Sequence, residues 1–203
     1  MTTCQECGMA YIQGLPEDER EHSRWHDHVV NGLPTRPLKS DRVLWEAQGK
    51  RITVVIARSP RPQRNRAEAI ASLANLETNY NGGIYHAAQQ PDDSDIHLFL
   101  YHERSRALGL AILEKRSTVW RCRWRNSGPP ECEELKGHEP MWSVAFLWVH
   151  RNVRRTGVAR RVLARAMHHL CVSCEHIGWY TPFTDDGRTF VKALCPIEFY
   201  VGK

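Results

Sequence analysis

Two cysteines and two histidines near the N-terminus have the spacing of a zinc site. Two residues separate Cys4 from Cys7, and fourteen residues later His22 and His26 follow with three residues between them. Zinc takes four sulfur or nitrogen ligands in a tetrahedron, and closely spaced pairs bring two ligands from each of two elements. Residues four apart lie on one face of a helix, so both imidazoles can reach one ion. The pattern predicts a C2H2-type finger.

The expected finger, residues 1–33, has features of a structural module. A segment of this size cannot build its own core, so a bound metal supplies the missing stability. Its helix begins with Glu17-Asp18-Glu19, which suits the positive end of a helix but repels phosphate. Helices that read a DNA groove begin with basic and amide side chains instead. His28 is an alternative to His26 as ligand, with poorer spacing.

A second pattern lies where an apolar segment meets an arginine-rich one. Residues 142–149 are an almost continuous apolar run, typical of a buried strand, and residues 155–170 repeat apolar side chains at helical spacing. The junction reads Arg154-x-x-Gly157-x-Ala159. A helix N-terminus offers unpaired N–H groups and partial positive charge, and small residues there let a phosphate approach. We expect this junction to bind a cofactor pyrophosphate.

Composition and charge restrict the class of protein. The chain has 203 residues and a net charge of +5; residues 1–33 carry six acids and two bases, a net of −4, so the rest carries +9. The longest apolar stretch, residues 144–149, is far shorter than the about 20 residues of a membrane span, and no secretory signal is visible. We expect a soluble protein that is cytoplasmic, or nuclear in a eukaryote. We also expect its seven cysteines to bind metal or to stay free rather than to form disulfides.

The two motifs must be positioned by an alternation of strands and helices. Apolar patterning predicts strands at 51–57, 95–101, 107–113, 117–125, 142–149, 177–181 and 197–201, and helices at 67–76, 155–170 and 187–194. Turns are expected at 79–83 and 103–106, a linker or extended arm at 34–50, and a loop at 126–140. This order predicts a mixed α/β (α+β) fold, with residues 51–203 forming one domain around a central sheet.

In this order the motifs resemble GNAT-fold acetyltransferases, and more closely the cohesion-establishment (Eco/ESCO-type) branch. The finger, followed by Asn31-Gly32, resembles the N-terminal finger of that family. Asp41-Arg42-Val43-Leu44 and Gly49-Lys50-Arg51-Ile52 resemble the segment that joins finger and catalytic domain. The acetyl-CoA motif is matched by Leu147-Trp148-Val149 and Arg154-Arg155-x-x-Val158-Ala159, and the C-terminal motif by Asp186-Gly187-Arg188, Phe190 and Cys195.

The resemblance implies a GNAT fold, structural zinc, acetyl-CoA as cosubstrate and acetyl transfer to an amine, which in that family is a lysine of a cohesin subunit. It also implies an acetyl-CoA site made of Leu147, Trp148, Val149, Arg154, Arg155, Thr156, Gly157, Val158, Ala159 and Arg160. Two acidic features of the family differ. Its helix glutamate is Ala164 in this chain, and its Ser-Asp pair is Thr181 and Pro182.

An attacking amine must lose a proton near neutral pH, either to a base within hydrogen-bonding distance or through water. Our candidates are Asp185 as base, His150 as an alternative base and Thr181 as a hydroxyl that holds water. Asp186 is also expected to cap the helix that follows it. Further groups near the expected cleft are Glu139, Tyr180 and Tyr200, and either tyrosine could protonate the leaving thiolate or else pack in the core.

Three functional hypotheses follow. The first is an acetyl-CoA-dependent N-acetyltransferase acting on a protein lysine or on a small-molecule amine such as an aminoglycoside. A polycationic acceptor would be attracted by the acids Glu131, Glu133, Glu134 and Glu139. The second is a non-catalytic GNAT-fold module that binds CoA or a partner. The third is nucleic-acid binding through Arg58, Arg61, Arg64 and Arg66.

Overall fold

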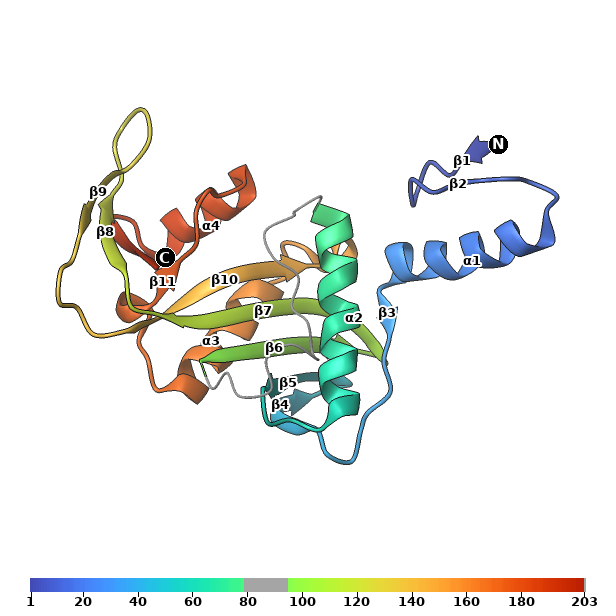
Figure 1. Cartoon of the computed structure of the whole chain (residues 1–203), viewed down its shortest axis with the longest axis horizontal. Coiled ribbons are helices and arrows are strands. Elements are labelled where there is room, and N and C mark those ends of the chain that lie inside the picture. Colours follow the sequence, from blue (N-terminus) through green and yellow to red (C-terminus); the bar gives the residue numbers. More distant parts are fainter. Residues whose placement is uncertain (79–94, 203) are drawn as a thin grey trace.

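A small N-terminal module projects from a sheet that carries helices on both faces (Figure 1). The computed structural model describes residues 1–78 and 95–202, and the turn expected at 79–83 lies outside them. The module consists of β1 (Thr2–Thr3), β2 (Ala10–Tyr11) and α1 (Pro16–Asn31). None of the described helices is long and apolar enough to cross a membrane.

The sheet has ten strands in the described part of the chain. They are β3 (Leu33–Pro34), β4 (Arg42–Ala47), β5 (Lys50–Ile56), β6 (Ile96–Glu103), β7 (Arg106–Arg116), β8 (Val119–Arg123), β9 (Glu131–Glu134), β10 (Met141–Val149), β11 (Gly178–Trp179) and β12 (Glu198–Gly202). Their order is β4-β5-β6-β7-β10-β11-β12-β8-β9, and β3 pairs with β7. All neighbours are antiparallel except β10-β11 and β11-β12, which are parallel. This mixed sheet agrees with the predicted fold class.

Three further α-helices cover the sheet, and alternation along the strands explains why both faces are buried. They are α2 (Arg61–Thr78), α3 (Val158–Leu170) and α4 (Asp185–Leu194). On β6, Phe99 packs in the cluster that contains the apolar face of α3, whereas Leu98 and Leu100 pack in the cluster that contains α2. A strand buried on both sides needs apolar residues at consecutive positions, which accounts for the apolar runs in the sequence.

Two segments differ from the sequence prediction. Residues 34–50, expected as a linker or extended arm, include β4, which pairs with β5. The loop expected at 126–140 includes β9, whose four residues are all exposed and so lack the apolar alternation that identifies a strand. Strand β9 pairs with β8, which itself pairs with β12 and not with the β6-β7 hairpin.

The prediction that the cysteines form no disulfide is wrong for one pair. Cys122 on β8 and Cys132 on β9 are directly opposite each other and form a disulfide. The prediction relied on the expected redox compartment, whereas the pairing follows from strand register. The remaining cysteines, at positions 4, 7, 171, 174 and 195, are free thiols.

The C-terminal end of α1 is fixed to the sheet domain. Trp25 and Val29 pack against the apolar cluster beneath α2, and Arg106 of β7 forms an ion pair with Asp27 at 2.6 Å, which lowers the pKa of that carboxyl. The Asn152 side chain donates to the Val30 carbonyl oxygen over 2.6 Å. The last carbonyls of a helix lack partners within it, so donors from the domain complete this end of α1.

A buried polar network joins β6, β5 and the segment between β3 and β4. The ring nitrogens of His102 on β6 are hydrogen-bonded to the hydroxyls of Thr35 and Thr53, at 3.0 and 3.2 Å. Burial, and then the nearby cations Arg51 and Arg66, lowers the pKa of His102 to about 3. The Arg66 side chain is itself buried in an ion pair with Asp41. Arg66 is therefore not available for nucleic acid, contrary to the third hypothesis.

The first prediction concerns Gly32, which follows α1. Its φ of 83° suits glycine, and a Cβ there would lie 2.7 Å from the Ala107 carbonyl oxygen. We expect Gly32→Ala to lower the free energy of unfolding by about 2 to 4 kcal/mol, through backbone strain and overlap together. The matched control is Gly14→Ala, which has φ 87° but no atom within 4 Å of the added Cβ. Equal losses for both variants in urea unfolding would contradict the steric argument.

The second prediction concerns His102. Because the folded state holds this histidine neutral down to a pKa of about 3, whereas the unfolded chain protonates it near 6.5, stability falls as pH drops below 6.5. We expect His102→Gln to remove about 2 kcal/mol of the stability difference between pH 7 and pH 5. Urea unfolding at the two pH values measures this difference. The same change at exposed His176 should leave it unaltered.

Candidate functional site

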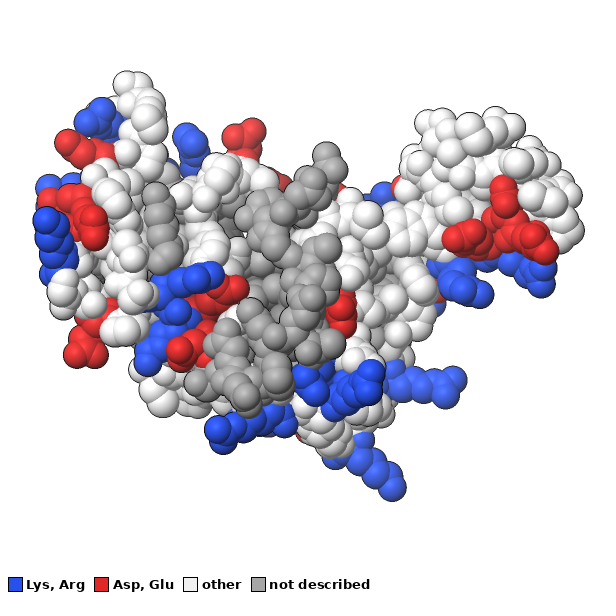
Figure 2. Space-filling model, in the orientation of Figure 1, with Lys and Arg blue, Asp and Glu red and all other residues white. Residues whose placement is uncertain are grey.

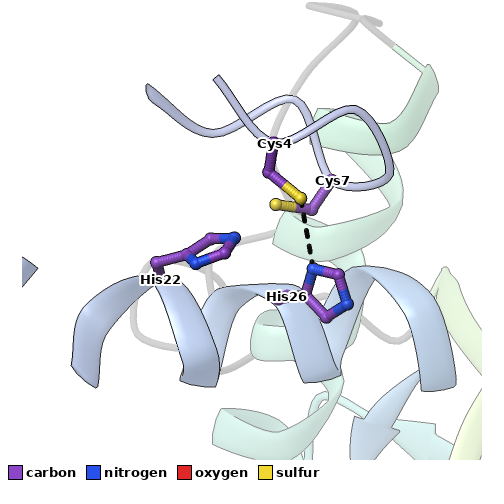
Figure 3. A group of neighbouring side chains, drawn as sticks. All are labelled: Cys4, Cys7, His22 and His26. Carbon is purple, nitrogen blue, oxygen red and sulfur yellow. Dashed lines mark hydrogen bonds between the residues drawn. The ribbon is translucent and has the colours of Figure 1, made fainter. Parts of the chain in front are cut away.

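The four residues predicted to bind zinc lie together. Their ligand atoms are within 4.8 Å of one another, with Cys4 and Cys7 on the loop between β1 and β2 and with His22 and His26 one turn apart on α1 (Figure 3). The Cys4 Sγ and His26 Nδ1 atoms are 3.4 Å apart. His28, the alternative ligand, is not part of this cluster.

The cluster fits a zinc ion chemically. His22 Nε2 is buried and has no hydrogen-bond partner in the described part of the chain, which is costly unless another ligand occupies the site. Glu6 contacts His26 Nε2 at 3.1 Å, so Nδ1 faces the thiols; zinc-binding histidines commonly have such a carboxylate partner. Hydrogen bonding with the Cys7 backbone is the largest of the effects that lower the pKa of the Cys4 thiol to about 6. This favours the thiolate, the form that binds metal.

The zinc loop also contacts the second predicted site. Arg151, in the 3-10 turn Arg151–Val153 that follows β10, donates to the Glu6 carbonyl oxygen over 3.0 Å. His150 is fully buried at the end of β10. Its Nε2 donates to the Val29 carbonyl oxygen of α1, and its Nδ1 accepts from the Asn152 N–H. The finger is therefore attached to the segment that leads into the expected phosphate loop.

The central feature of the second site is the separation of two parallel strands. β11 pairs with β10 only at Ser143 and Val144, and the last bond between them runs from the Tyr180 N–H to the Val144 carbonyl oxygen. β10 has a bulge between Val144 and Phe146 and continues, paired with β7, to Val149. Among the described residues, no other strand pairs with β10 on the edge that β11 leaves.

The expected phosphate loop lies at the far end of this edge. Gly157 has the left-handed φ of 85° and precedes α3 as its N-cap, without a side-chain hydrogen bond to the first turn. The first helical bond runs from the Arg161 N–H to the Gly157 carbonyl oxygen, 3.0 Å. The N–H groups of Val158, Ala159 and Arg160 therefore have no partner within the helix. An anion could accept from them, so the pyrophosphate site remains a prediction.

The loop arginines are held by partners that sequence reasoning missed. Arg154 donates to the Val149 carbonyl oxygen and to Glu77 at the end of α2, at 2.9 and 3.0 Å. Glu77 also accepts from the indole N–H of Trp148 over 2.8 Å. Arg155 forms an exposed ion pair with Asp186 of α4 at 2.6 Å. No spacing rule links Glu77 to residues more than seventy positions away, so the sequence held no signal for it.

The structure corrects one candidate base, and the roles proposed for Asp185 and Thr181 stay predictions. His150 has both ring nitrogens hydrogen-bonded, and burial lowers its pKa, so it is a structural contact to the finger and not a base. Asp185 and Thr181 lie on the surface around the start of α4, and Thr184, not Asp186, caps that helix by accepting from the Gly187 N–H.

A cluster of three polar side chains lies where β10 and β11 separate, and the sequence had indicated only one of them, Tyr180. Tyr180, one of the proposed proton donors, donates its hydroxyl to Glu114 of β7 over 2.7 Å. Arg116 of β7 donates to both of these side chains. Burial, and next the bond to Glu114, raises the pKa of Tyr180 above its usual range. In the sequence, Glu114 directly follows the apolar run at 107–113. Its position at the end of this run was the only local indication that it could have a functional role.

The third prediction tests the metal centre. The protein as purified should contain one zinc per chain by elemental analysis, and Cys4→Ser should lower zinc content while exposing α1 to proteolysis, since the module has no apolar core of its own. The matched control is Cys171→Ser, at an exposed thiol outside the cluster. Full zinc occupancy in Cys4→Ser would contradict the assigned ligand set.

Comparison with known proteins finds relatives of the finger and of nearly the whole chain. The family model for the zinc finger of ESCO acetyltransferases matches residues 1–28. N-acetyltransferase ESCO2 of Mus musculus is 27% identical over 203 residues, and ESCO2 of Homo sapiens is 25% identical over 210 residues. Each alignment covers 96% of this chain but only 33% and 34% of the relative, so the chain spans about a third of their length.

Solved structures agree in fold. The xEco2 acetyltransferase domain superimposes with a TM-score of 0.65 at 20% identity, over 82% of this chain and 98% of that one. The same domain bound to a K105-CoA conjugate gives a TM-score of 0.64 at 20% identity, over 81% and 98%. The chain is thus a GNAT-fold protein with an ESCO-type zinc finger, similar to the ESCO-type N-acetyltransferases over 96% of its length.

Proposed function

We propose that this chain is an acetyl-CoA-dependent N-acetyltransferase with a structural zinc finger, and that its acceptor is a protein lysine or another primary amine. The observation that carries the proposal is the uncapped N-terminus of α3, placed by Gly157 at the end of the β10 edge that β11 leaves. The similarity to ESCO N-acetyltransferases supports the same activity.

Each part of the proposed acetyl-CoA site has a distinct task. The N–H groups of Val158, Ala159 and Arg160 bind the pyrophosphate, and Arg154 and Arg155 supply positive charge beside them. The backbone of β10 around Leu147 offers strand-edge groups to an amide-containing arm, as sheets do for extended peptides. When bound, acetyl-CoA supplies an activated acyl group as a thioester.

The charge of the surface around β8 and β9 affects how strongly a polycationic acceptor would be attracted. Figure 2 shows basic and acidic side chains interleaved over these strands. Glu133 pairs with Arg121, and Glu131 pairs with Arg125 at 3.3 Å. Because these acids are partly neutralised, attraction of a polycation by the 126–140 segment is weaker than its sequence indicates. The acceptor assay therefore includes both protein-like and small-molecule amines.

The fourth prediction tests the cosubstrate site. Ala159→Glu places a carboxylate in the first turn of α3, which suits the helix dipole but competes with a pyrophosphate. We expect at least a tenfold weaker Kd for acetyl-CoA by calorimetry, with unchanged thermal stability. Ala164→Glu adds the same charge at an exposed position on the same helix and should change the Kd less than threefold.

Acetyl transfer is measured by mass spectrometry with poly-L-lysine and an aminoglycoside as acceptors, alongside release of CoA thiol. Acetylated product supports the proposal and identifies the class of acceptor. Absence of acetyl-CoA binding at millimolar concentration would refute it, and binding without transfer to any amine would favour the non-catalytic module.

A further inference from the structure

A carboxylate, a phenol and a guanidinium meet at the point where β10 and β11 separate. Glu114 lies on β7 directly opposite Ser143 of β10, and Tyr180 follows β11 and forms the last bond to β10. The separation of the strands exposes the β10 backbone from this point onward. The cluster of Glu114, Arg116 and Tyr180 therefore lies at the opposite end of the proposed acetyl-CoA edge from the phosphate loop.

Two glycines pack closely on Ser143, the residue opposite Glu114. Gly178 of β11 and Gly202 of β12 flank Ser143, and a Cβ at either glycine would overlap the Ser143 hydroxyl. Ser143 itself is fully buried. The Glu114 side chain keeps 20% of its surface exposed, whereas Arg116 keeps 40%. Glu114 is thus held by the fold but can still be reached by a solute.

Hydrogen bonds fix one oxygen of Glu114 and leave the other open. Oε2 accepts from the Tyr180 hydroxyl and from Arg116, and the Arg116 guanidinium also lies 5.2 Å from the centre of the Tyr180 ring. In the described part of the chain, no residue donates to Oε1. An ionised carboxylate can accept several hydrogen bonds, so Oε1 is a free acceptor held in a fixed direction.

We propose that Glu114 is the catalytic base for the acceptor amine and that Tyr180 and Arg116 are positioning residues that hold it. This inference rests on the proposed acetyl-CoA-dependent function. A cationic primary amine would donate to Oε1, which gives the carboxylate a charge-assisted hydrogen bond. The ligand class is therefore an alkylammonium such as a lysine side chain.

The reaction balances with this single base. Glu114 takes one proton from the ammonium, and the nitrogen lone pair forms the C–N bond to the acetyl carbon of the thioester. The C–S bond then breaks, and the second nitrogen proton passes to the sulfur to give CoA thiol. Glu114 releases its proton to solvent through its exposed edge. The products are the N-acetyl amine, CoA thiol and one proton.

The fifth prediction uses Glu114→Gln in the full chain, with acetyl-CoA and poly-L-lysine as probes. We expect kcat to fall by about 10²- to 10⁴-fold, as for loss of a general base, with the Kd for acetyl-CoA changed less than threefold. The residual rate should rise about tenfold per pH unit from 7 to 9, because only amine that is already deprotonated reacts, and its pKa is about 10.4. The wild-type rate should rise less steeply.

Matched variants keep the test interpretable. Glu46→Gln makes the same change at an exposed glutamate on β4, which has no part in the proposed site, and should leave kcat and its pH profile unaltered. Tyr180→Phe should lower kcat by about tenfold while keeping the wild-type pH profile, because the base remains but is less well oriented. Glu114→Asp, which retains a carboxylate, should recover part of the rate and the wild-type pH profile.

The outcomes separate this inference from the proposed function. If Glu114→Gln folds, binds acetyl-CoA and retains kcat within threefold of wild type, Glu114 is not the base although the acetyltransferase assignment stands. If Glu114→Gln does not fold, Glu114→Asp decides, and either a kcat equal to that of wild type or an altered pH profile would overturn the proposal. A wild-type protein that binds acetyl-CoA but acetylates no amine would overturn the proposed function and this inference together.

Discussion

The early separation of β11 from β10 is the constraint on which the rest of the site depends. After the bond from the Tyr180 N–H to the Val144 carbonyl oxygen, the two parallel strands no longer pair. Buried backbone N–H and C=O groups must have hydrogen-bond partners. The unpaired edge of β10 is therefore stable only if water or a ligand can reach its N–H and C=O groups. The bulge in β10 between Val144 and Phe146 occurs at the same point and bends the strand there. In the proposed function, this break in pairing provides the edge that acetyl-CoA binds.

The finger belongs to the same arrangement. Its helix ends against the segment that follows β10, where His150 and Asn152 donate to the carbonyl oxygens of Val29 and Val30. Because burial lowers the pKa of His150, this contact uses a neutral imidazole with one donor and one acceptor nitrogen. Zinc bound at the four ligands would hold α1 to the loop between β1 and β2, and α1 contacts the turn that leads to Gly157. A metal there would therefore support the expected phosphate loop from a distance without taking part in the chemistry.

The sequence could predict those features that depend on neighbours along the chain. The zinc ligands follow from two local spacings, and the helix start at Gly157 follows from an apolar strand next to an amphipathic helix. Strand β9 could not be predicted, because its side chains are all exposed and only pairing with β8 defines it. The contacts of Glu77 and Glu114 connect residues far apart in the chain, and only the folded sheet brings them together. His150 was misassigned for the same reason, since its position in the sequence does not show that α1 covers it.

Charge is distributed along β10 in a way that suits two substrates of opposite sign. Arginines follow its C-terminal end, where the N-terminus of α3 adds positive potential. Glu114 faces Ser143 near the other end, and Ser143 and Val149 are six residues apart, about 20 Å in an extended strand. A long anionic molecule lying along the edge would place its phosphates among the arginines and its far end beside a carboxylate. In the proposed function, the arginines attract the phosphates and the carboxylate attracts an ammonium, so this charge separation would orient the cosubstrate and favour a cationic acceptor.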